Sequence, residues 1–385
     1  MTVTVRRTVV LAVVVFSGLL VARFAVHRLE DAMRGHPAWL PPTFQIREQT
    51  RQSASFFKWI PDAELGFVLP PDLRQTIITP DFTFTRATDA CGFPNPGSWP
   101  AHVDIVFTGD SLLIGDGVGV ARTFVSLAGK RLRDQTIINL GNPGAGLERQ
   151  RLIYDRYGAR LAPSLAIATL YAASDLSNDR HWHAWRKDPL GEEYNEFRLE
   201  YGHRTEPPAG ELENRFDRRP LYNWVQSIIE PLLWSARRIR HRQRMPDGQE
   251  IYFDRNIVIA AKGALAEDDA DLVALSASLD RFRKQVNAQG AVFAVILIPS
   301  KEEVFAIEQP PPPGSPISRI KGLLDAKGIP YLDLYPVLAA SAEHATPYFQ
   351  RDIHLNRYGN EVVAEAFLAW YSRSMKPAAR ASASP

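Results

Sequence analysis

A serine, a histidine and an aspartate in this 385-residue chain have the types and local settings that covalent acyl transfer requires. Ser111 follows the pattern of a buried strand, Val103–Gly109, and precedes a segment of helical periodicity, Val120–Arg133. Asp352 and His354 stand two residues apart, just before the last segment with a helical pattern. A serine hydroxyl is a poor nucleophile until a base takes its proton, and a carboxylate orients that base. The three side chains therefore predict a nucleophile, a base and an orienting carboxylate, if the fold brings them together.

Each of these stretches also has a simpler interpretation when it is taken alone. Gly109-Asp110-Ser111 is a common turn tripeptide, so it also fits a plain β-turn with a capping serine, in which glycine permits the sharp turn. The pair at 352 and 354 fits an ordinary polar surface loop. A metal centre is disfavoured, because no second pair of His, Asp or Glu has matching spacing and Cys91 is the only cysteine. We therefore expect no metal ion, and the predicted serine chemistry needs no organic cofactor.

The elements that must position these residues alternate between strands and helices. Beyond the strand before Ser111, strands are predicted at Thr136–Leu140, Ser164–Tyr171, Ala291–Ile298 and Tyr331–Leu334. Beyond Val120–Arg133, helices are predicted at Leu147–Tyr157, Asp268–Gln289, Ile317–Lys327 and Tyr358–Trp370. Such alternation is typical of an α/β fold with a doubly wound parallel sheet flanked by helices. Open sheets of this kind bind ligands at the carboxyl ends of their strands, and Ser111 stands at that edge.

The N-terminal part has a pattern typical of membrane insertion. Thr8–Val26 is apolar or small except for Arg23, and as a helix it would span about 28 Å, roughly one bilayer core. We predict an uncleaved single-pass signal-anchor in the cytoplasmic (inner) membrane, with the catalytic domain in the periplasm or outside the cell. A cleaved signal peptide is the main alternative.

Composition divides the chain into segments. These are 1–30 for the anchor, 31–100 for a linker and a β-containing extension, 101–376 for the α/β domain and 377–385 for a disordered tail. The extension includes a half-exposed strand at Asp81–Arg86. Within the domain, Asn178–Arg255 has no clear strand and is interpreted as a helical insertion near the site edge. Its basic run, Arg237–Arg244, predicts either a small cap with a solvated face or a lid that binds an anionic polymer or lipid headgroups. The formal net charge of +2 gives no reason to expect a nucleic-acid partner.

Taken together, these stretches resemble the SGNH/GDSL hydrolase superfamily over about Val103–Phe367. The run Gly109–Leu112 matches the first sequence block of this family. The match implies that Ser111 is the nucleophile and that its backbone N–H contributes to the oxyanion hole. Gly144 matches the glycine of the second block, whose N–H is a further oxyanion donor. The resemblance also implies a flavodoxin-like, three-layer arrangement of helices and sheet.

The last block matches the family and the third block departs from it. The run Asp352–Gly359 resembles the last block, which implies that His354 is the base and that the aspartate two residues before it is the orienting group. The family expects Gly-Asn-Asp after the third strand, but the aligned residues here are Ala173–Asp175. Either Ser174 replaces the asparagine as an oxyanion donor, or Asn178 reaches in, or the hole is weaker. A lost donor costs roughly 3–4 kcal/mol in related chemistry.

The apolar N-terminus, the strand-like Asp81–Arg86 and the turn Cys91–Phe93 also resemble an envelope, membrane-anchored subgroup of the superfamily. Members of that subgroup are linked to acyl groups on cell-surface polysaccharides. The resemblance implies a serine esterase that cleaves an O-acyl ester, such as an acetyl ester, on an envelope glycan or exopolysaccharide. Two alternatives stay open: an O-acyltransferase to a glycan with the same triad, and a non-catalytic polysaccharide-binding protein. The expected partners are an acylated glycan or small ester and the membrane, and no nucleic acid.

Overall fold

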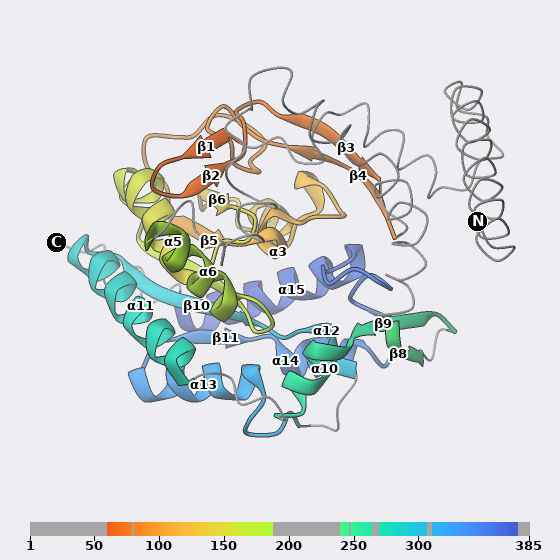
Figure 1. Ribbon diagram of the computed structural model, residues 1–385. Helices are drawn as coiled ribbons and strands as arrows, with labels where there is room; N and C mark the ends of the chain where they lie inside the picture. Colours follow the sequence, from red (N-terminus) through yellow and green to blue (C-terminus); the bar gives the residue numbers. More distant parts are fainter. Residues whose placement is uncertain are drawn as a thin grey trace, which may run out of the picture. The chain divides into compact units, whose positions relative to one another are not determined.

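The structure is a computed structural model that describes residues 60–78, 81–187, 239–245, 248–263, 269–305 and 310–375 (Figure 1). All of these residues except Ile78 belong to one compact unit, which comprises Lys58–Ile77 and Asp81–Pro385. The predicted anchor, Thr8–Val26, and the tail 377–385 lie outside the described residues. Among the helices that the structure does describe, none is long and apolar enough to cross a bilayer.

The centre of the unit is a five-stranded sheet in which every strand runs parallel to its neighbours. Its strands are β5 (Ile105–Gly109), β6 (Ile137–Gly141), β7 (Leu165–Tyr171), β10 (Val292–Ile298) and β11 (Tyr331–Asp333). They lie in the order β11–β10–β7–β5–β6. Counted along the chain, this is the 2-1-3-4-5 order of flavodoxin-like folds, whose order reverses between the first and third strands. The predicted parallel α/β sheet is therefore confirmed, and β5 stands at the reversal.

Helices cover the sheet on both faces. The helices of this unit that the structure describes are α3 (Ser111–Ile114), α4 (Phe124–Arg131), α5 (Leu147–Ile153), α6 (Asp175–Lys187), α10 (Arg255–Ala261), α11 (Asp269–Ala288), α12 (Lys301–Phe305), α13 (Pro316–Lys327), α14 (Tyr335–Ser341) and α15 (Arg357–Trp370). Because parallel crossovers are right-handed, the reversal of strand order puts α4 and α5 on opposite faces. In agreement, α4 packs against α15. The helix α5 packs instead against α6 and α11 (Figure 1). This cover on both faces explains why β5 and β7 are buried at every position.

Two of the predicted helices are divided. The segment Val120–Arg133 forms a 3₁₀ turn, Val120–Arg122, and then α4. The break falls at Thr123, which has an extended backbone and caps α4 through its side chain. The helix α5 runs on into a π-helical turn, Tyr154–Gly158, and a 3₁₀ turn, Ala159–Leu161. The other strands and helices predicted for the sheet region agree with the structure to within two residues at each end.

Aromatic side chains fill the core on both faces of the sheet. Phe107 of β5 meets Phe124 of α4 and Phe367 of α15 edge-on, with ring centroids 6.0 and 5.2 Å apart. On the other face, Phe282 of α11 contacts Phe293 of β10 at 4.8 Å. Such aromatic pairs stabilise beyond the area that they bury. They fix the helices against the strands whose carboxyl ends carry the candidate site.

Two small sheets precede the central one. They are β1 (Ile60–Asp62) with β2 (Gly66–Val68), and β3 (Arg74–Ile78) with β4 (Thr83–Ala87). The strand β4 confirms the half-exposed strand predicted at Asp81–Arg86. Phe84 and Arg86 point inward and are buried, while their neighbours on β4 are more exposed. Because Arg86 carries a full charge, its burial requires a charged partner, which the candidate site supplies.

The insertion Asn178–Arg255 differs from the prediction at both of its described ends. It begins inside α6, where Trp182 and Trp185 pack against Phe67 of β2. It ends in an antiparallel hairpin of β8 (Ile239–Arg244) and β9 (Glu250–Asp254), so the prediction that the insertion contains no strand is wrong. The buried residues of β9 join a small apolar cluster. Pairing with β9 makes the basic segment a strand, although its own composition gives no such signal. Residues 188–238 lie outside the described part.

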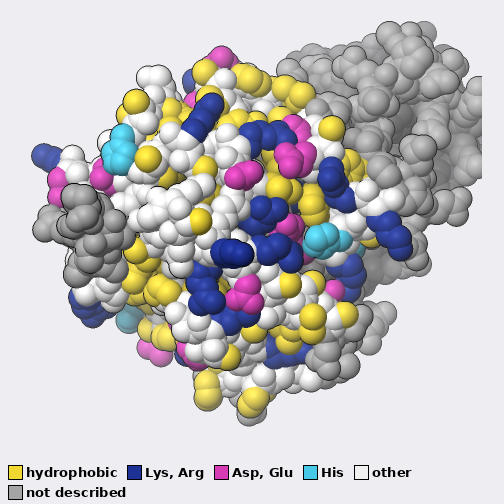
Figure 2. Space-filling model, turned by 90° about the vertical axis from the view of Figure 1, so that its left-hand side faces the viewer, with side chains coloured by type: hydrophobic (Ala, Val, Ile, Leu, Met, Phe, Trp, Pro, Cys, Tyr) yellow, Lys and Arg dark blue, Asp and Glu magenta, His cyan; other side chains and the backbone are white. Residues whose placement is uncertain are grey.

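Charges of both signs lie side by side on the face shown in Figure 2, where Lys and Arg are interspersed with Asp and Glu. Ion pairs of this kind join α5 to α11. Glu148 binds Arg151 at 2.8 Å and Arg281 at 2.9 Å. Near β1, Arg156 binds Asp62 at 2.5 Å. Such pairing keeps local fields small, which agrees with the formal net charge of +2.

Candidate active site

Ser111 is the first residue of α3 and stands just beyond the carboxyl end of β5. The cap of this helix is Asp110, whose carboxylate accepts the N–H of Leu112 at 2.9 Å, so the serine itself is not the capping residue. Gly109 lacks the positive φ that the predicted sharp turn would need. A Cβ at Gly109 would instead lie 1.9 Å from Oγ1 of Thr169 on β7. The expected reason for this glycine was therefore wrong: it permits the close approach of β5 and β7.

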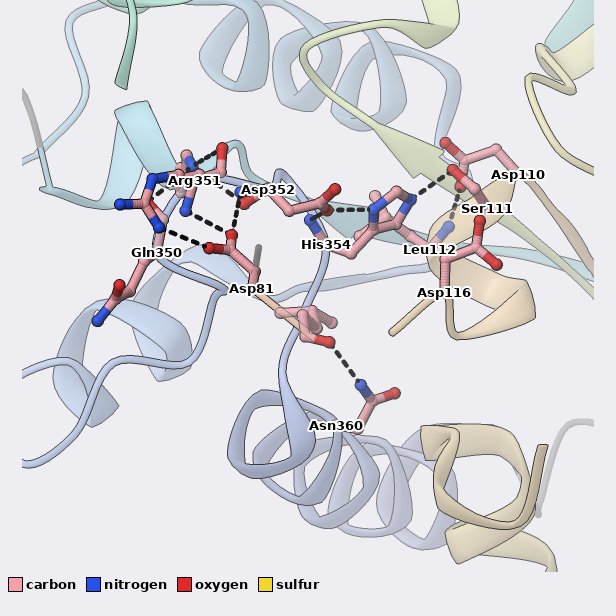
Figure 3. Close-up of polar contacts among 12 residues, drawn as sticks. Asp81, Asp110, Ser111, Leu112, Asp116, Gln350, Arg351, Asp352, His354 and Asn360 are labelled. Atoms are coloured by element: carbon pink, nitrogen blue, oxygen red, sulfur yellow. Dashed lines mark hydrogen bonds and ion pairs between the residues drawn. The ribbon is translucent and has the colours of Figure 1, made fainter. Parts of the chain in front are cut away.

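The imidazole of His354 connects Ser111 to Asp352 (Figure 3). Its Nε2 is 2.7 Å from the serine Oγ, and its Nδ1 is 2.5 Å from Oδ1 of the aspartate. An ionised carboxylate can only accept, so Nδ1 carries a proton, and the neutral ring accepts at Nε2. The backbone N–H of His354 also donates to Asp352 Oδ1, at 2.9 Å. The structure thus brings the three residues together, and their catalytic roles stay a prediction.

Two asparagines fix this loop to the helices behind it. Asn356 caps α15, because its Oδ1 accepts the N–H of Gly359 at 3.0 Å. Its Nδ2 donates to the carbonyl of Tyr348 at 3.0 Å. Asn360, one turn further along α15, accepts the N–H of Phe124 at 3.0 Å. The helix α4, which follows α3 in the chain, is thereby tied to α15, the helix that follows His354.

Charge and burial act in opposite directions on the groups of the site. Burial acts to lower the pKa of His354, but Asp352, Asp116 and Asp110 raise it to about 9. Burial acts to raise the pKa of Asp352, but the attraction of His354 and the hydrogen bonds from it hold this pKa below its usual range. Burial raises the pKa of Asp110 to about 6, although His354 favours its ionised form. The environment therefore favours an ionised Asp352 beside a readily protonated imidazole.

Gly144 lies in a tight turn between β6 and α5. The turn is closed by a bond from the N–H of Ala145 to the carbonyl of Asn142 at 3.1 Å. A proline followed by Gly144 at φ +60° fits a type II turn, which requires glycine at that position. Arg149 supports the turn, because it donates to the carbonyl of Gly144 at 3.0 Å and to Oδ1 of Asn142 at 2.9 Å. The guanidinium also lies 4.4 Å above the ring of Phe67.

Ser174 and Asn178, the two alternatives for the third oxyanion donor, are neighbours in the structure. Ser174 immediately precedes α6, and Asn178 lies one turn later. The Nδ2 of Asn178 donates to Ser174 Oγ at 3.5 Å, and its backbone N–H donates to the carbonyl of Ser174 at 2.8 Å. Asp175 is buried between them and accepts the N–H of Tyr171 at 2.9 Å. Both side chains therefore belong to one turn that is tied to the carboxyl end of β7.

Sequence reasoning missed four charged residues around this site. Lys301 and Asp81 bind the backbone of the loop that carries Asp352. Arg86 of β4 pairs with Asp116, which follows α3, through Nε at 3.2 Å and Nη2 at 2.6 Å. The sequence signal that could have identified these residues is a charged residue next to, or inside, a segment whose apolar pattern predicts burial. A charge in that setting must be paired, and pairing at a strand end indicates a site.

The described residues contain no cluster of three or more His, Cys, Asp or Glu side chains that is arranged to hold a metal ion. Cys91 is a free thiol in the loop before β5.

The C-terminal part of the chain matches a protein-family model. Residues 260–383 match the family described as SGNH hydrolase-like domain, acetyltransferase AlgX. These residues include Asp352, His354 and α15, whose pattern and geometry indicate the same superfamily. The C-terminal third of the chain is therefore similar to an SGNH hydrolase-like domain. The resemblance stated from the sequence is confirmed at this level, and the membrane-anchored subgroup stays a prediction.

Several solved structures are similar to this chain at low identity. A member of the lipolytic G-D-S-L family from Veillonella parvula is 10% identical with a TM-score of 0.38, over 70% of this chain and 98% of that chain. A catalytic mutant of the acetylxylan esterase Axe2 from Geobacillus stearothermophilus is 10% identical with a TM-score of 0.36, over 70% and 94%. The acetyl xylan esterase AlAXEase is 14% identical with a TM-score of 0.35, over 70% and 100%. TM-scores of this size carry no functional argument. No curated protein matches the chain significantly.

Proposed function

We propose that this chain transfers an acyl group from an ester through a covalent acyl-enzyme on Ser111. The observation that carries the proposal is the hydrogen-bonded series from Ser111 Oγ through His354 to Asp352, with distances of 2.7 and 2.5 Å. Ser111 and His354 are 243 positions apart in the chain, so their contact is a product of the fold. The match of residues 260–383 to an SGNH hydrolase-like domain supports the same chemistry.

The reaction has two half-reactions with balanced proton transfers. First, Ser111 Oγ attacks the ester carbonyl carbon, and the serine proton passes to Nε2 of His354. Collapse of the tetrahedral intermediate breaks the ester C–O bond, and the histidine returns the proton to the leaving alcohol. Next, a hydroxyl acceptor attacks the acyl carbon and gives its proton to Nε2. The bond from Ser111 to the acyl group then breaks, and the serine takes that proton back. Asp352 stays ionised and stabilises the imidazolium.

We assign stabilisation of the oxyanion to the backbone N–H groups of Ser111 and Gly144 and to the hydroxyl of Ser174. The bond from Asn178 Nδ2 uses the Ser174 oxygen as an acceptor, so the hydroxyl proton can point toward an oxyanion. Asn178 is the alternative donor, through a rotation of its amide toward the substrate. One well-placed donor of this kind contributes roughly 3–4 kcal/mol to the stability of the transition state.

The acceptor of the acyl group decides the type of enzyme. With water as the acceptor, the chain is an esterase that removes an O-acyl group, with acetyl as the first candidate, from an envelope glycan or exopolysaccharide. We take this as the first proposal. With a sugar hydroxyl as the acceptor, the chain is an O-acyltransferase, which the match to a family described as an acetyltransferase favours. A non-catalytic polysaccharide-binding protein is the least supported of the three functions, because binding alone does not require a hydrogen-bonded Ser–His–Asp triad.

The proposed location follows from the N-terminal segment. Thr8–Val26 is long and apolar enough for one membrane span, so we propose a single-pass protein of the cytoplasmic membrane with the α/β unit in the periplasm or outside the cell. An envelope glycan on that side of the membrane would then be within reach of the site.

Turnover of p-nitrophenyl acetate by the full-length chain tests the proposal. Ser111→Ala, His354→Ala and the double variant should fall to a similar residual rate, because a nucleophile and its base act as a unit. Asp352→Asn should lose less activity, because nucleophile and base remain. Addition of a glycan acceptor, with detection of acylated glycan by mass spectrometry, then separates transfer from hydrolysis.

Circular dichroism establishes that each variant is folded, and Ser126→Ala, a serine on α4, is the matched control that should keep full activity. Full ester turnover by Ser111→Ala would contradict the proposal outright. A wild-type chain that neither cleaves nor transfers acyl groups on any acylated glycan tested makes the binding-protein interpretation the better one.

A further inference from the structure

The loop that carries Asp352 lies between two buried charges of opposite sign. The Nζ of Lys301 donates to three consecutive carbonyl oxygens, those of Gln350, Arg351 and Asp352, at 3.4, 2.8 and 3.0 Å. From the other side, Oδ2 of Asp81 accepts the backbone N–H of Arg351 at 2.6 Å and that of Asp352 at 2.7 Å. Figure 3 shows the Asp81 carboxylate directed at this stretch of backbone. The peptide units on both sides of the Asp352 Cα are therefore held by full charges.

Both charges are almost completely shielded from water. Lys301 is 1% exposed, and the side chain of Asp81 is 4% exposed. Removing a charge from water is costly unless the charge is paired and hydrogen-bonded, and here the backbone of one short loop supplies many of those bonds. Because charge-assisted hydrogen bonds are stronger than neutral ones, the loop is held more tightly than an ordinary surface turn.

The hairpin β8–β9 adds a third support to the same loop. The backbone N–H of Tyr252 on β9 donates to the carbonyl of Gln350 at 2.8 Å. The guanidinium of Arg351 lies 4.9 Å from the centre of the Tyr252 ring and pairs with Asp81 at 3.5 Å. The start of α12, the segment before β4 and the hairpin thus converge on residues 350–352.

We propose that Lys301 and Asp81 are positioning residues that hold Asp352 at the distance from which it orients His354. The reach from the Asp352 carboxylate to Nδ1 is a single short hydrogen bond, so a small rotation of its peptide units would break the series from Ser111. Orientation of a catalytic group matters because a misplacement of about 1 Å costs on the order of 10²-fold in rate. This inference rests on the proposed function and adds the residues that preorganise it.

Three variants of the full-length chain test the inference against a matched control. Lys301→Met removes the charge and its hydrogen bonds, Lys301→Gln keeps a neutral donor, and Asp81→Asn keeps the shape of the carboxylate. The control is Lys321→Met, which removes an exposed ion pair with Asp333 on α13 and β11. We expect kcat for p-nitrophenyl acetate to fall on the order of 10²-fold in Lys301→Met and Asp81→Asn, with little change in KM. Lys301→Gln should lie between Lys301→Met and the wild type, and the control should match the wild type.

Two further readouts separate positioning from a merely structural role. The proton between Nδ1 of His354 and Asp352 should give a low-field ¹H NMR signal in the wild type and the control, and the signal should shift or disappear in the loop variants. The titration midpoint of His354 should also fall, because the carboxylate of Asp352 would move away while those of Asp116 and Asp110 remain. A merely structural role would lower the unfolding temperature. It would leave kcat, the low-field ¹H NMR signal and the titration midpoint of His354 unchanged in the folded protein.

The outcomes are separable. A folded Lys301→Met or Asp81→Asn chain with wild-type kcat and a wild-type NMR signal overturns the inference. If Lys301→Met does not fold, Asp81→Asn alone decides, with the same criteria. If the wild type turns over no ester, the proposed function fails, and the NMR signal alone decides whether Lys301 and Asp81 position Asp352.

Discussion

The imidazole of His354 faces three carboxylates whose own contacts differ. Asp352 is hydrogen-bonded to the ring, Asp110 caps α3, and Asp116 is held by the buried Arg86. In the proposed reaction, this arrangement would stabilise the imidazolium that forms when His354 takes the serine proton. The same arrangement protonates more of the free enzyme at neutral pH, and a protonated imidazole cannot act as the base. At the scale of single residues, we therefore infer that the site stabilises the imidazolium of the transition state. In exchange, a smaller fraction of His354 is neutral, and so able to act as the base, at neutral pH.

The pH dependence of turnover follows from this balance. The base form must be neutral, so kcat/KM for p-nitrophenyl acetate should rise as pH increases through the His354 pKa of about 9. Asp352→Asn should move the midpoint to lower pH while it lowers the maximum rate. In this variant the carboxylate of Asp352 no longer raises the pKa of His354, whereas those of Asp116 and Asp110 still do. Burial still lowers this pKa, so the pKa should fall.

A pH series corrected for spontaneous hydrolysis measures this midpoint, and Asp333→Asn, on β11, is the control. A profile that stays flat between about pH 7 and pH 10 contradicts the prediction, as does a midpoint that rises in Asp352→Asn.

At the scale of elements, two neighbouring side chains at the start of α6 are the candidates for the oxyanion donor that the family pattern places after the third strand. Ser174 precedes the helix and Asn178 follows one turn later, with their side chains 3.5 Å apart. We predict that Ser174→Ala lowers kcat with little change in KM, because an oxyanion bond strengthens only in the transition state. Asn178→Ala should have a smaller effect, since it removes only the group that orients the serine hydroxyl.

Steady-state kinetics of the two single variants and the double variant measure these effects. If Asn178→Ala lowers kcat and Ser174→Ala does not, the assignment of the third block to Ser174 is wrong, and Asn178 takes its place. Ser177→Ala is the control, because it removes a hydroxyl of the same turn whose proton is donated to the backbone carbonyl of Ser174.

Close packing of β5 against β7 makes a second prediction at this scale. A Cβ at Gly109 would lie 1.9 Å from Oγ1 of Thr169. This hydroxyl is buried and donates a hydrogen bond to the carbonyl of Thr108. Gly109→Ala should therefore reduce the free energy of unfolding by about 1–3 kcal/mol, as overpacked core substitutions do. Gly129→Ala on α4 is the matched control, because its Cβ would have 3.9 Å to the nearest atom. It should be neutral or stabilising by up to about 1 kcal/mol. Urea unfolding of both variants gives the comparison, and equal stabilities would refute the packing argument.

At the scale of the whole molecule, segments far apart in the chain meet at the carboxyl edge of one sheet. Asp81 precedes β4, Tyr252 belongs to the insertion, and Lys301 follows β10, yet all three bind residues 350–352. The extension and the insertion are therefore part of the support for the site.

Topology is the property to test at this scale. We predict that Thr8–Val26 holds the chain in the membrane, because its length and apolarity suit one span. Alkaline phosphatase fused after Pro385 should be active, since that enzyme folds only outside the cytoplasm. Replacement of two central residues, Val14→Asp with Val15→Asp, should release the chain or abolish export. An inactive fusion, or an unaltered full-length chain in the soluble fraction, would count against the anchor.

Local pattern was sufficient for the sheet and for the candidate catalytic residues. The apolar runs that became β5, β6, β7 and β10, and the periodicity of α11 and α15, follow from which faces are buried, and burial leaves its mark on neighbouring residues. Ser111 and His354 were recognisable because each lies within a few residues of a strand end or a helix start. The sequence therefore determined the fold class and predicted the three residues that the structure brings together.

Only the tertiary structure decided how those residues are held. Asp81 and Asp352 are 271 positions apart, and Lys301 is 51 positions from Asp352, so no local pattern connects them. For the same reason, sequence reasoning missed the hairpin β8–β9 and gave the wrong reason for Gly109. The pairing of β8 with β9 and the close approach of Gly109 to Thr169 are properties of the packed chain. Whether a charge is paired, and whether a backbone has room for a Cβ, depends on distance in space, which the fold alone supplies.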